Sequence, residues 1–137
     1  MKKAVIYHQS RTGTTEKMAY SIQEFLKTMA VESKVDSIKK VSVEDTKKAD
    51  IVCLGCWTHG FFLFAQHPEK IWIEKVQGMP DISNKKIILF TTYKIATGSI
   101  FKKMIKYLQG NPQEIITLKS KNGAISDEDK NKIKTFL

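Results

Sequence analysis

Hydrophobic residues along the chain occur first as short, nearly continuous runs. Runs of this kind are typical of strands that are buried on both faces of a parallel sheet. A weaker alternation of apolar and polar residues is typical of a strand nearer a sheet edge. Together they predict strands at 4–7, 31–38, 50–56, 86–93 and 114–118, of which 31–38 is the edge-like one.

Between these runs, apolar residues recur every three or four positions, which is the spacing of one helical face. Helices are therefore predicted at 15–29, 68–76 and 99–108. A last helix is predicted after Ser126, with Asp129 as its capping-box partner. Strands and helices thus alternate, which predicts an α/β fold with helices on both faces of a parallel sheet.

Two segments fit this alternation less well. The connection at 37–49 has room for a crossover between the second and third strands, but its helical signal is poor. The apolar segment FFLFA at 61–65 is predicted to be core or the lead-in to the next helix, with shielding of a ligand or docking of a partner as alternatives.

Length and hydropathy limit the class of protein. The 137 residues suit a single domain spanning 1–137, and a hydrophobic content of 42% excludes a disordered chain. No apolar run approaches the length of a membrane span, and the apolar run near the amino terminus is too short for a signal peptide. The expected compartment is the cytoplasm.

The formal net charge of +9 makes an anionic partner worth considering. Arg11 is the only arginine, so nearly all of the positive charge comes from lysine. Modules that read a DNA sequence depend on arginine side chains that bond guanine. Sequence-specific recognition of nucleic acid is therefore not predicted.

Cysteine and histidine residues give little sign of redox or metal chemistry. Cys53 and Cys56 form a C-x-x-C pattern, but they lie in a predicted strand. Residues three apart in a strand point to opposite faces and are roughly 10 Å apart, which is too far for a disulfide. His8, His59 and His67 lack the spacing and companions of metal ligands, so no metal site is predicted.

The first predicted strand is followed by an unusual cluster of small polar residues. Ser10, Thr12, Thr14 and Thr15 surround Gly13, where the strand ends and a helix begins. A helix start presents unpaired N–H groups and a partial positive charge, which favour a phosphate. An ordinary helix cap explains one hydroxyl but not four with a glycine. The cluster therefore predicts a phosphate site, although it is neither a Walker loop nor G-x-G-x-x-G.

Three loops at the predicted carboxyl edge of the sheet resemble those of one family. The pattern S-x-T-G-x-T at 10–15 resembles the phosphate loop of flavodoxins. LGCWTHG at 54–60 is similar to that family's second flavin loop, which often reads G-C-S-T-W-G. TTYKIATGS at 91–99 is similar to the third loop, with Tyr93 five residues before Gly98. The resemblance runs the whole chain, at the length of short-chain flavodoxins.

The resemblance implies a flavodoxin-like three-layer α/β/α sandwich with a five-stranded parallel sheet in the order 2-1-3-4-5. It implies FMN as cofactor, with its phosphate in the first loop and Tyr93 stacked on the outer face of the flavin ring. Either His59 or Trp57 could cover the inner face, where the family commonly has an aromatic residue. The residues implied to bind the cofactor are Ser10, Arg11, Thr12, Gly13, Thr14, Thr15, Trp57, Thr58, His59, Gly60, Thr91, Thr92, Tyr93, Thr97 and Gly98.

The resemblance also implies a protein that shuttles electrons between a reductase and a redox partner, rather than a stand-alone enzyme with catalytic residues of its own. Most flavodoxins are acidic, whereas this chain is basic, with Lys94, Lys102 and Lys103 near the third loop. Coulomb's law then predicts that the anionic, fully reduced flavin forms more easily here and that the partner has an acidic docking face. The expected assembly is a monomer or weak dimer, without insertion into a membrane.

Two other functions stay open. A flavin enzyme could act directly on a quinone or a porphyrinogen, and a binding module could keep the fold without flavin. Two other classes with such sheets are excluded. A receiver domain needs acidic residues where the chain has His8 and Gln9, and an aspartate where it has Cys56. A small phosphatase needs C-x5-R, which neither cysteine begins.

Overall fold

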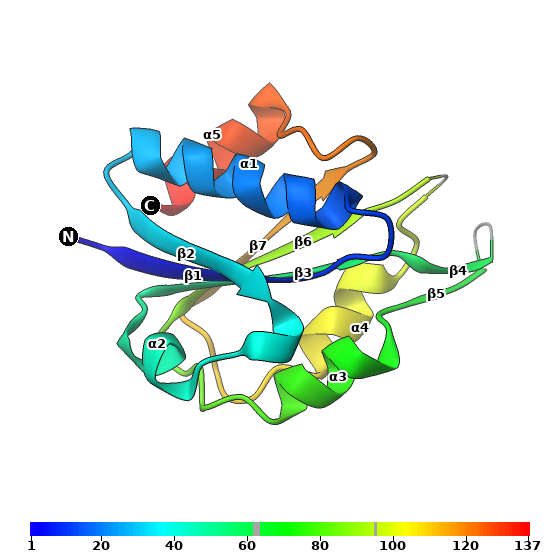
Figure 1. Cartoon of the computed structure of the whole chain (residues 1–137), viewed down its shortest axis with the longest axis horizontal. Helices are drawn as coiled ribbons and strands as arrows, with labels where there is room; N and C mark the ends of the chain where they lie inside the picture. Colours follow the sequence, from blue (N-terminus) through cyan, green and yellow to red (C-terminus); the bar gives the residue numbers. More distant parts are fainter. Residues whose placement is uncertain (62–63, 95) are drawn as a thin grey trace.

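The computed structural model of the chain describes residues 1–61, 64–94 and 96–137. The strands of its main sheet are β1 (Lys3–Gln9), β2 (Glu32–Ser37), β3 (Ile51–Trp57), β6 (Lys86–Thr92) and β7 (Glu114–Ser120). All are parallel, in the order β2-β1-β3-β6-β7 (Figure 1). Counted along the chain within this sheet the order is 2-1-3-4-5, which confirms the predicted fold class.

Helices cover both faces of the sheet, so the fold has three layers (Figure 1). α1 (Thr14–Thr28) and α5 (Asp127–Phe136) lie on one face. α2 (Val43–Lys48), α3 (Lys70–Gln77) and α4 (Ile100–Lys106) lie on the other. The helices predicted from the spacing of apolar residues all form, with ends that shift by a few residues.

The connection between β2 and β3 contains a short 3-10 helix, η1 (Ile38–Lys40), and then α2. The side chain of Ser42 caps α2 by accepting a hydrogen bond from the N–H of Asp45 (3.1 Å). The hydroxyls of Tyr7 and Thr46 lie 3.0 Å apart, and the Thr46 side chain is buried. Tertiary contacts therefore stabilise a helix whose own sequence signal is poor.

A two-stranded antiparallel hairpin follows β3. It consists of β4 (His59–Phe61) and β5 (Phe64–His67). The segment 61–65 was expected to be core or the lead-in to the next helix, and its described residues lie in these two strands before that helix; Phe62 and Leu63 lie outside the described residues. A continuous apolar run does not carry a period that separates strand from helix, so the sequence pattern missed the hairpin.

The helix after this hairpin begins later than predicted. α3 starts at Lys70, with Glu69 as its N-cap residue, two residues after the predicted start at Pro68. The side chain of Glu69 makes no capping hydrogen bond to the helix. Its carboxylate is therefore available for other contacts.

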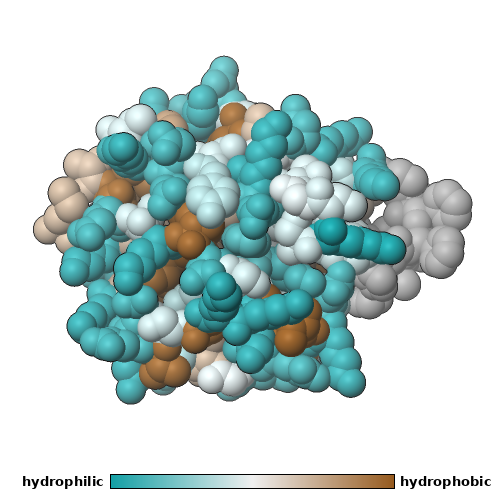
Figure 2. All heavy atoms as spheres, in the orientation of Figure 1, coloured by the Kyte–Doolittle hydropathy of each residue, from teal (hydrophilic) through white to brown (hydrophobic). Residues whose placement is uncertain are grey.

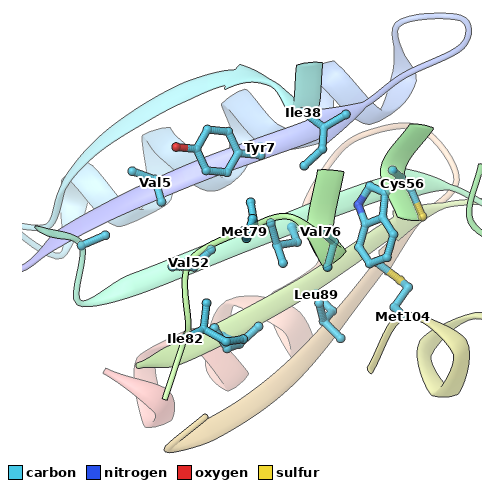
Figure 3. Packing of buried hydrophobic residues seen from close by; sticks show 14 of the residues in the cluster. Val5, Tyr7, Ile38, Val52, Cys56, Val76, Met79, Ile82, Leu89 and Met104 are labelled. Carbon is cyan, nitrogen blue, oxygen red and sulfur yellow. The ribbon is translucent and has the colours of Figure 1, made fainter. Parts of the chain in front are cut away.

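Two hydrophobic clusters fill the space between the sheet and its helical layers. One contains side chains of α1 and α5, such as Ile22 and Phe136. The other lies on the opposite face and contains both Met104 of α4 and Cys56 of β3 (Figure 3). Cys53 belongs to the first cluster, so the two free cysteines face opposite sides, as predicted. Burial raises the pKa of both thiols, which keeps them protonated.

Most large apolar side chains of the described residues are buried in these two clusters. Hydrophilic residues cover most of the face seen in Figure 2, where hydrophobic residues form small separate groups. Within the part of the chain that the structure describes, no helix has both the length and the apolar composition needed to span a membrane.

The last helix forms one half of the predicted capping box. The Ser126 side chain accepts a hydrogen bond from the N–H of Asp129 (3.1 Å), as predicted. The Asp129 carboxylate instead accepts a hydrogen bond from the N–H of Lys119 on β7 (3.3 Å). Asp129 therefore ties α5 to the edge of the sheet.

The packing of Gly55 against Phe90 sets the spacing at the centre of the fold. The two residues pair across β3 and β6. A Cβ atom at Gly55 would lie 2.1 Å from the ring of Phe90, which is fully buried. Contacts this short do not occur between real atoms, so any larger residue must displace the ring.

We expect Gly55→Ala to lower the free energy of unfolding by about 1–3 kcal/mol, the usual cost of overpacking a core. Gly78→Ala is the matched control, because a Cβ atom there would meet its nearest neighbour, the Glu74 carbonyl oxygen, at 3.5 Å. The control is expected to change stability by about 0.5 kcal/mol or less. Urea unfolding followed by circular dichroism measures both. Equal stabilities of the two variants would contradict the close-approach argument.

Candidate functional site

The register of the sheet brings three loops to one edge. Gln9 at the end of β1 pairs with Cys56 of β3, and Cys56 pairs with Thr91 of β6. One residue further on, Trp57 pairs with Thr92. The loops that follow these strands therefore start side by side, as Figure 1 shows at the end of the sheet where α1 begins.

The first loop leaves most of its hydroxyls outside any helix cap. Gly13, with a left-handed φ of 93°, is the N-cap residue of α1 and supplies no side chain. Ser10 instead accepts a hydrogen bond from the N–H of Gly13 (2.9 Å), which closes the loop. Thr12 is exposed and Thr14 half-buried. Neither Thr14 nor Thr15 is therefore the N-cap residue of α1. The first N–H groups of α1 face the same loop.

Thr15 differs from Thr12 and Thr14 in that its side chain is buried. Its hydroxyl lies 2.6 Å from that of Thr92 at the end of β6. This hydrogen bond joins the start of α1 to the start of the third loop. The hydroxyl of Thr15 therefore fixes the distance between the two loops.

The second loop is joined to the third by a second set of hydrogen bonds. The hydroxyls of Thr58 and Thr91 lie 3.0 Å apart, and Thr91 also donates to the carbonyl oxygen of Cys56 (2.7 Å). The N–H of Thr58 donates to the carbonyl oxygen of Thr92 (2.8 Å). Thr91 and Thr92 are buried, so all three loops rest on a polar layer at the edge of the core.

Tyr93 lies half-buried at the start of the third loop. Its N–H donates to the carbonyl oxygen of Ser120 at the end of β7 (3.2 Å), and the ammonium of Lys121 lies 5.6 Å from the centre of its ring. Further along the loop, Thr97 is half-buried and Gly98 is exposed with a left-handed φ of 54°. Tyr93 is thus held by a backbone hydrogen bond to Ser120 and by the ammonium of Lys121, both at the end of β7.

Trp57 lies between the first loop and α3. The guanidinium of Arg11 lies over its ring, 5.2 Å from the ring centre. The indole N–H donates to the carboxylate of Glu69, whose other oxygen accepts a hydrogen bond from the Gln9 side chain (3.1 Å). His59 lies two residues later in the hairpin, where it pairs with His67, and Gly60 follows it in β4.

Sequence reasoning gave no site role to Gln9, Glu69 or Lys121. Gln9 adjoins the first loop and could have been included on that ground. Glu69 is separated from Trp57 by the hairpin, and Lys121 follows a strand outside the three loops. No sequence spacing indicates contacts of that kind. Among the described residues, no group of three or more histidine, cysteine or acidic side chains could hold a metal ion.

A family model described as a flavodoxin domain matches residues 4–135. The chain belongs to the flavodoxin family. Membership in this family implies FMN as the cofactor and supports an FMN-type electron-transfer protein. Among curated proteins, no sequence matches the chain.

Solved flavodoxin structures share the fold of this family member. The solution structure of two-electron reduced Megasphaera elsdenii flavodoxin has a TM-score of 0.69 and 21% identity, covering 91% of this chain and 89% of its own. For oxidised Flavodoxin 1 from Bacillus cereus the TM-score is 0.63 and the identity 20%, with 98% and 94% covered. A flavodoxin from the domain Archaea has a TM-score of 0.60 and 18% identity, with 98% and 92% covered.

The residues at this edge fit the group that the flavodoxin family implies. A flavin phosphate needs several donors close together, and the first loop combines hydroxyls with the open N–H groups of a helix start. A flavin ring needs a flat apolar surface, and Tyr93 and Trp57 supply aromatic rings on the two neighbouring loops. The donor set and the aromatic residues are thus of the kinds that FMN requires.

His8 lies buried next to the first loop. Its side chain is 6% exposed, and its Nδ1 atom has no hydrogen-bond partner among the described residues. Its Nε2 atom lies 3.8 Å from the carboxylate of Glu16 in the first turn of α1. Burial lowers the pKa of His8 from its usual 6.5, and the negative charges of Glu16 and Asp36 oppose this only in part. The folded chain therefore holds His8 neutral at pH 7.

We expect this burial to make the chain less stable as the pH falls below 6.5. Between the folded and unfolded pKa values of His8 the unfolded chain binds more protons, so stability is lost with decreasing pH. His8→Gln cannot titrate and is expected to lose less stability than the wild type between about pH 7.5 and about pH 5.5. One proton contributes at most about 1.4 kcal/mol per pH unit. Urea unfolding at both pH values measures this, and identical pH dependence of the two proteins would contradict it.

Proposed function

We propose that this chain is a single flavodoxin-like domain over residues 1–137 that binds FMN and shuttles electrons between a reductase and a redox partner protein. The observation that carries the proposal is the meeting of the hydroxyl-rich start of α1 with two aromatic loops at one edge of the sheet. Its class is oxidoreductase and its compartment the cytoplasm. Two buried, unpaired cysteines agree with a reducing compartment.

We assign the phosphate of FMN to the first loop. Ser10, Thr12 and Thr14 provide hydroxyl donors, and the first N–H groups of α1 add their partial positive charge. Gly13 lets the backbone approach closely, because no atom of the described residues other than Gly13 and its chain neighbours lies within 4 Å of the position that its Cβ would take. Arg11 contributes charge from its place over Trp57.

We assign the flavin ring to the second and third loops. Tyr93 is assigned to the outer face of the ring, and the ammonium of Lys121 lies 5.6 Å from the centre of the tyrosine ring. The remaining assignments are backbone and hydroxyl contacts along the two loops. They comprise Thr58, His59, Gly60, Thr91, Thr92, Thr97 and Gly98.

The protein supplies binding and electrostatics, and bound FMN supplies the one- and two-electron redox chemistry. No side chain of this chain is required to transfer a proton in that role. The residues instead orient the ring, exclude water from its faces and set the local charge.

The charge around the third loop favours an acidic redox partner. Lys94, Lys102 and Lys121 are exposed at or near the carboxyl edge of the sheet. Complementary charge speeds diffusional encounter and fixes orientation more than it adds affinity. The proposed partner therefore presents carboxylates around its own redox centre, and this chain acts as a monomer or weak dimer.

Replacing Thr12 by valine tests the phosphate site. Valine keeps the shape of threonine and removes one donor, and a hydrogen bond to a charged group contributes about 1.5–3 kcal/mol. We expect Thr12→Val to weaken FMN binding by about tenfold or more. Fluorescence titration of the apoprotein measures the dissociation constant.

Riboflavin, which lacks the phosphate, is the matched control ligand. Its affinity is expected to be the same for the wild type and Thr12→Val. Equal loss of affinity for both ligands would place the effect of Thr12 outside phosphate recognition. Absence of flavin binding by the wild type would overturn the proposed function.

Removing the charge of Lys121 tests the electrostatic part of the proposal. A nearby cation stabilises the added negative charge of fully reduced FMN, so Lys121→Gln is expected to lower the second reduction potential of bound FMN. The expected shift is roughly 20–40 mV, or roughly 0.5–1 kcal/mol for one electron. Lys27→Gln in the last turn of α1 is the control. Spectroelectrochemical titration measures both, and equal potentials for the two variants would contradict the argument.

A further inference from the structure

Four side chains from three parts of the chain meet beside the first loop. Gln9 ends β1, Arg11 belongs to the first loop, Trp57 ends β3, and Glu69 precedes α3. The Gln9 amide and the Trp57 indole N–H each donate to a different oxygen of the Glu69 carboxylate. Arg11 covers the indole ring at 5.2 Å from its centre. The four therefore form one continuous chain of contacts between two loops and a helix.

The side chain of Glu69 does not make the contact that is usual for a residue at the start of a helix. It is the N-cap residue of α3, where an oxygen-bearing side chain would ordinarily bond the first N–H groups of the helix. Its side chain makes no such bond and extends toward Trp57 and Gln9. The helix start still favours its negative charge through the macrodipole. The direction of the carboxylate is thus set by the loops rather than by the helix it precedes.

The contacts of Trp57 distinguish it from a residue that simply covers a ligand. Its N–H is bonded to Glu69, and one part of its ring lies against Arg11. Since Arg11 belongs to the first loop, the indole connects that loop to the start of the second. A half-buried aromatic side chain fixed at both its edge and its face acts as a brace between the two loops.

We propose that Glu69 is a positioning residue, which fixes Trp57 against Arg11 and so holds the phosphate loop and the flavin loop at the spacing that one FMN molecule must bridge. This proposal rests on the proposed function. It gives Trp57 a bracing role between the two loops. Glu69 itself touches neither phosphate nor ring in this role.

The proposal makes a prediction opposite in sign to simple electrostatics. Glu69 is a negative charge near a site for a phosphate, so its removal would tighten FMN binding if charge alone mattered. Loss of a positioning contact weakens binding, because the ligand must then order the loops itself. The direction of the change in affinity therefore separates the two roles.

The first experiment measures FMN affinity of the apoprotein by fluorescence titration. We expect Glu69→Ala to raise the dissociation constant by about tenfold, the effect of losing hydrogen bonds to a charged group. Glu74→Ala is the matched control: Glu74 is an exposed acid on α3, and its carboxylate lies 4.0 Å from the Lys70 ammonium. The control removes the same charge and is expected to leave the constant unchanged within about twofold.

A second variant keeps the proposal testable if Glu69→Ala is too unstable to titrate. Trp57→Phe keeps an aromatic ring for Arg11 and removes the indole N–H donor. It is expected to weaken FMN binding by about as much as Glu69→Ala, and the double variant by no more than either single change. Additive losses would mean that Glu69 and Trp57 act separately, which overturns the proposal.

The second experiment needs no cofactor. The chain has two tryptophans, so the apoprotein gives two indole N–H signals in a ¹H–¹⁵N spectrum. Trp72 is fully buried and its indole nitrogen has no hydrogen-bond partner among the described residues, which makes its signal an internal reference. Glu69→Ala is expected to move the Trp57 signal upfield, because a carboxylate acceptor is lost, and to leave the Trp72 signal in place.

The outcomes separate failure of this proposal from failure of the proposed function. A wild type that binds no FMN overturns the proposed function, and this proposal with it. A wild type that binds FMN beside a Glu69→Ala variant that binds equally or more tightly overturns only the positioning role. An unchanged Trp57 indole signal in Glu69→Ala also overturns it, whatever the affinity.

Discussion

The hydrogen-bonded register of β1, β3, β6 and β7 is the constraint on which the site depends. Gln9, Cys56, Thr91 and Lys119 lie across from one another along the sheet. Parallel strands place all of their carboxyl ends at one edge, so three loops far apart in sequence begin within neighbouring positions. A slip of one residue in any strand would turn its last side chains to the other helical layer and separate the loops.

At the carboxyl ends of these strands, the threonine hydroxyls have two different roles. Thr15, Thr58, Thr91 and Thr92 bond one another or nearby backbone, and thereby hold the loop bases together. Thr12 is exposed and Thr14 is half-buried at the start of α1. A buried polar layer is costly unless its groups are paired, and here the pairing rigidifies the base of the site. The first loop can therefore be preorganised while its outer donors stay available.

Periodicity in the sequence was enough to predict the main sheet, because buried parallel strands and amphipathic helices each carry their own spacing. It was insufficient for α2, which depends on the contact between Tyr7 and Thr46, and for the hairpin within a continuous apolar run. The same limit applies to the site. The first loop could be predicted because its residues are contiguous, whereas the Glu69 contact with Trp57 forms only when the hairpin folds back.

Two cation–aromatic contacts flank the site, and they hold two of the positively charged side chains of this basic protein in place. Arg11 lies over Trp57 and Lys121 over Tyr93. Each contact is worth only about 0.5–1 kcal/mol at an exposed position, but each fixes a long charged side chain that would otherwise move freely. Both cations come from outside the two aromatic loops, so each contact joins an aromatic loop to another segment of the chain. The positive charge of the chain is thus placed around the candidate flavin site at defined points, where it acts on the site as well as on an approaching partner.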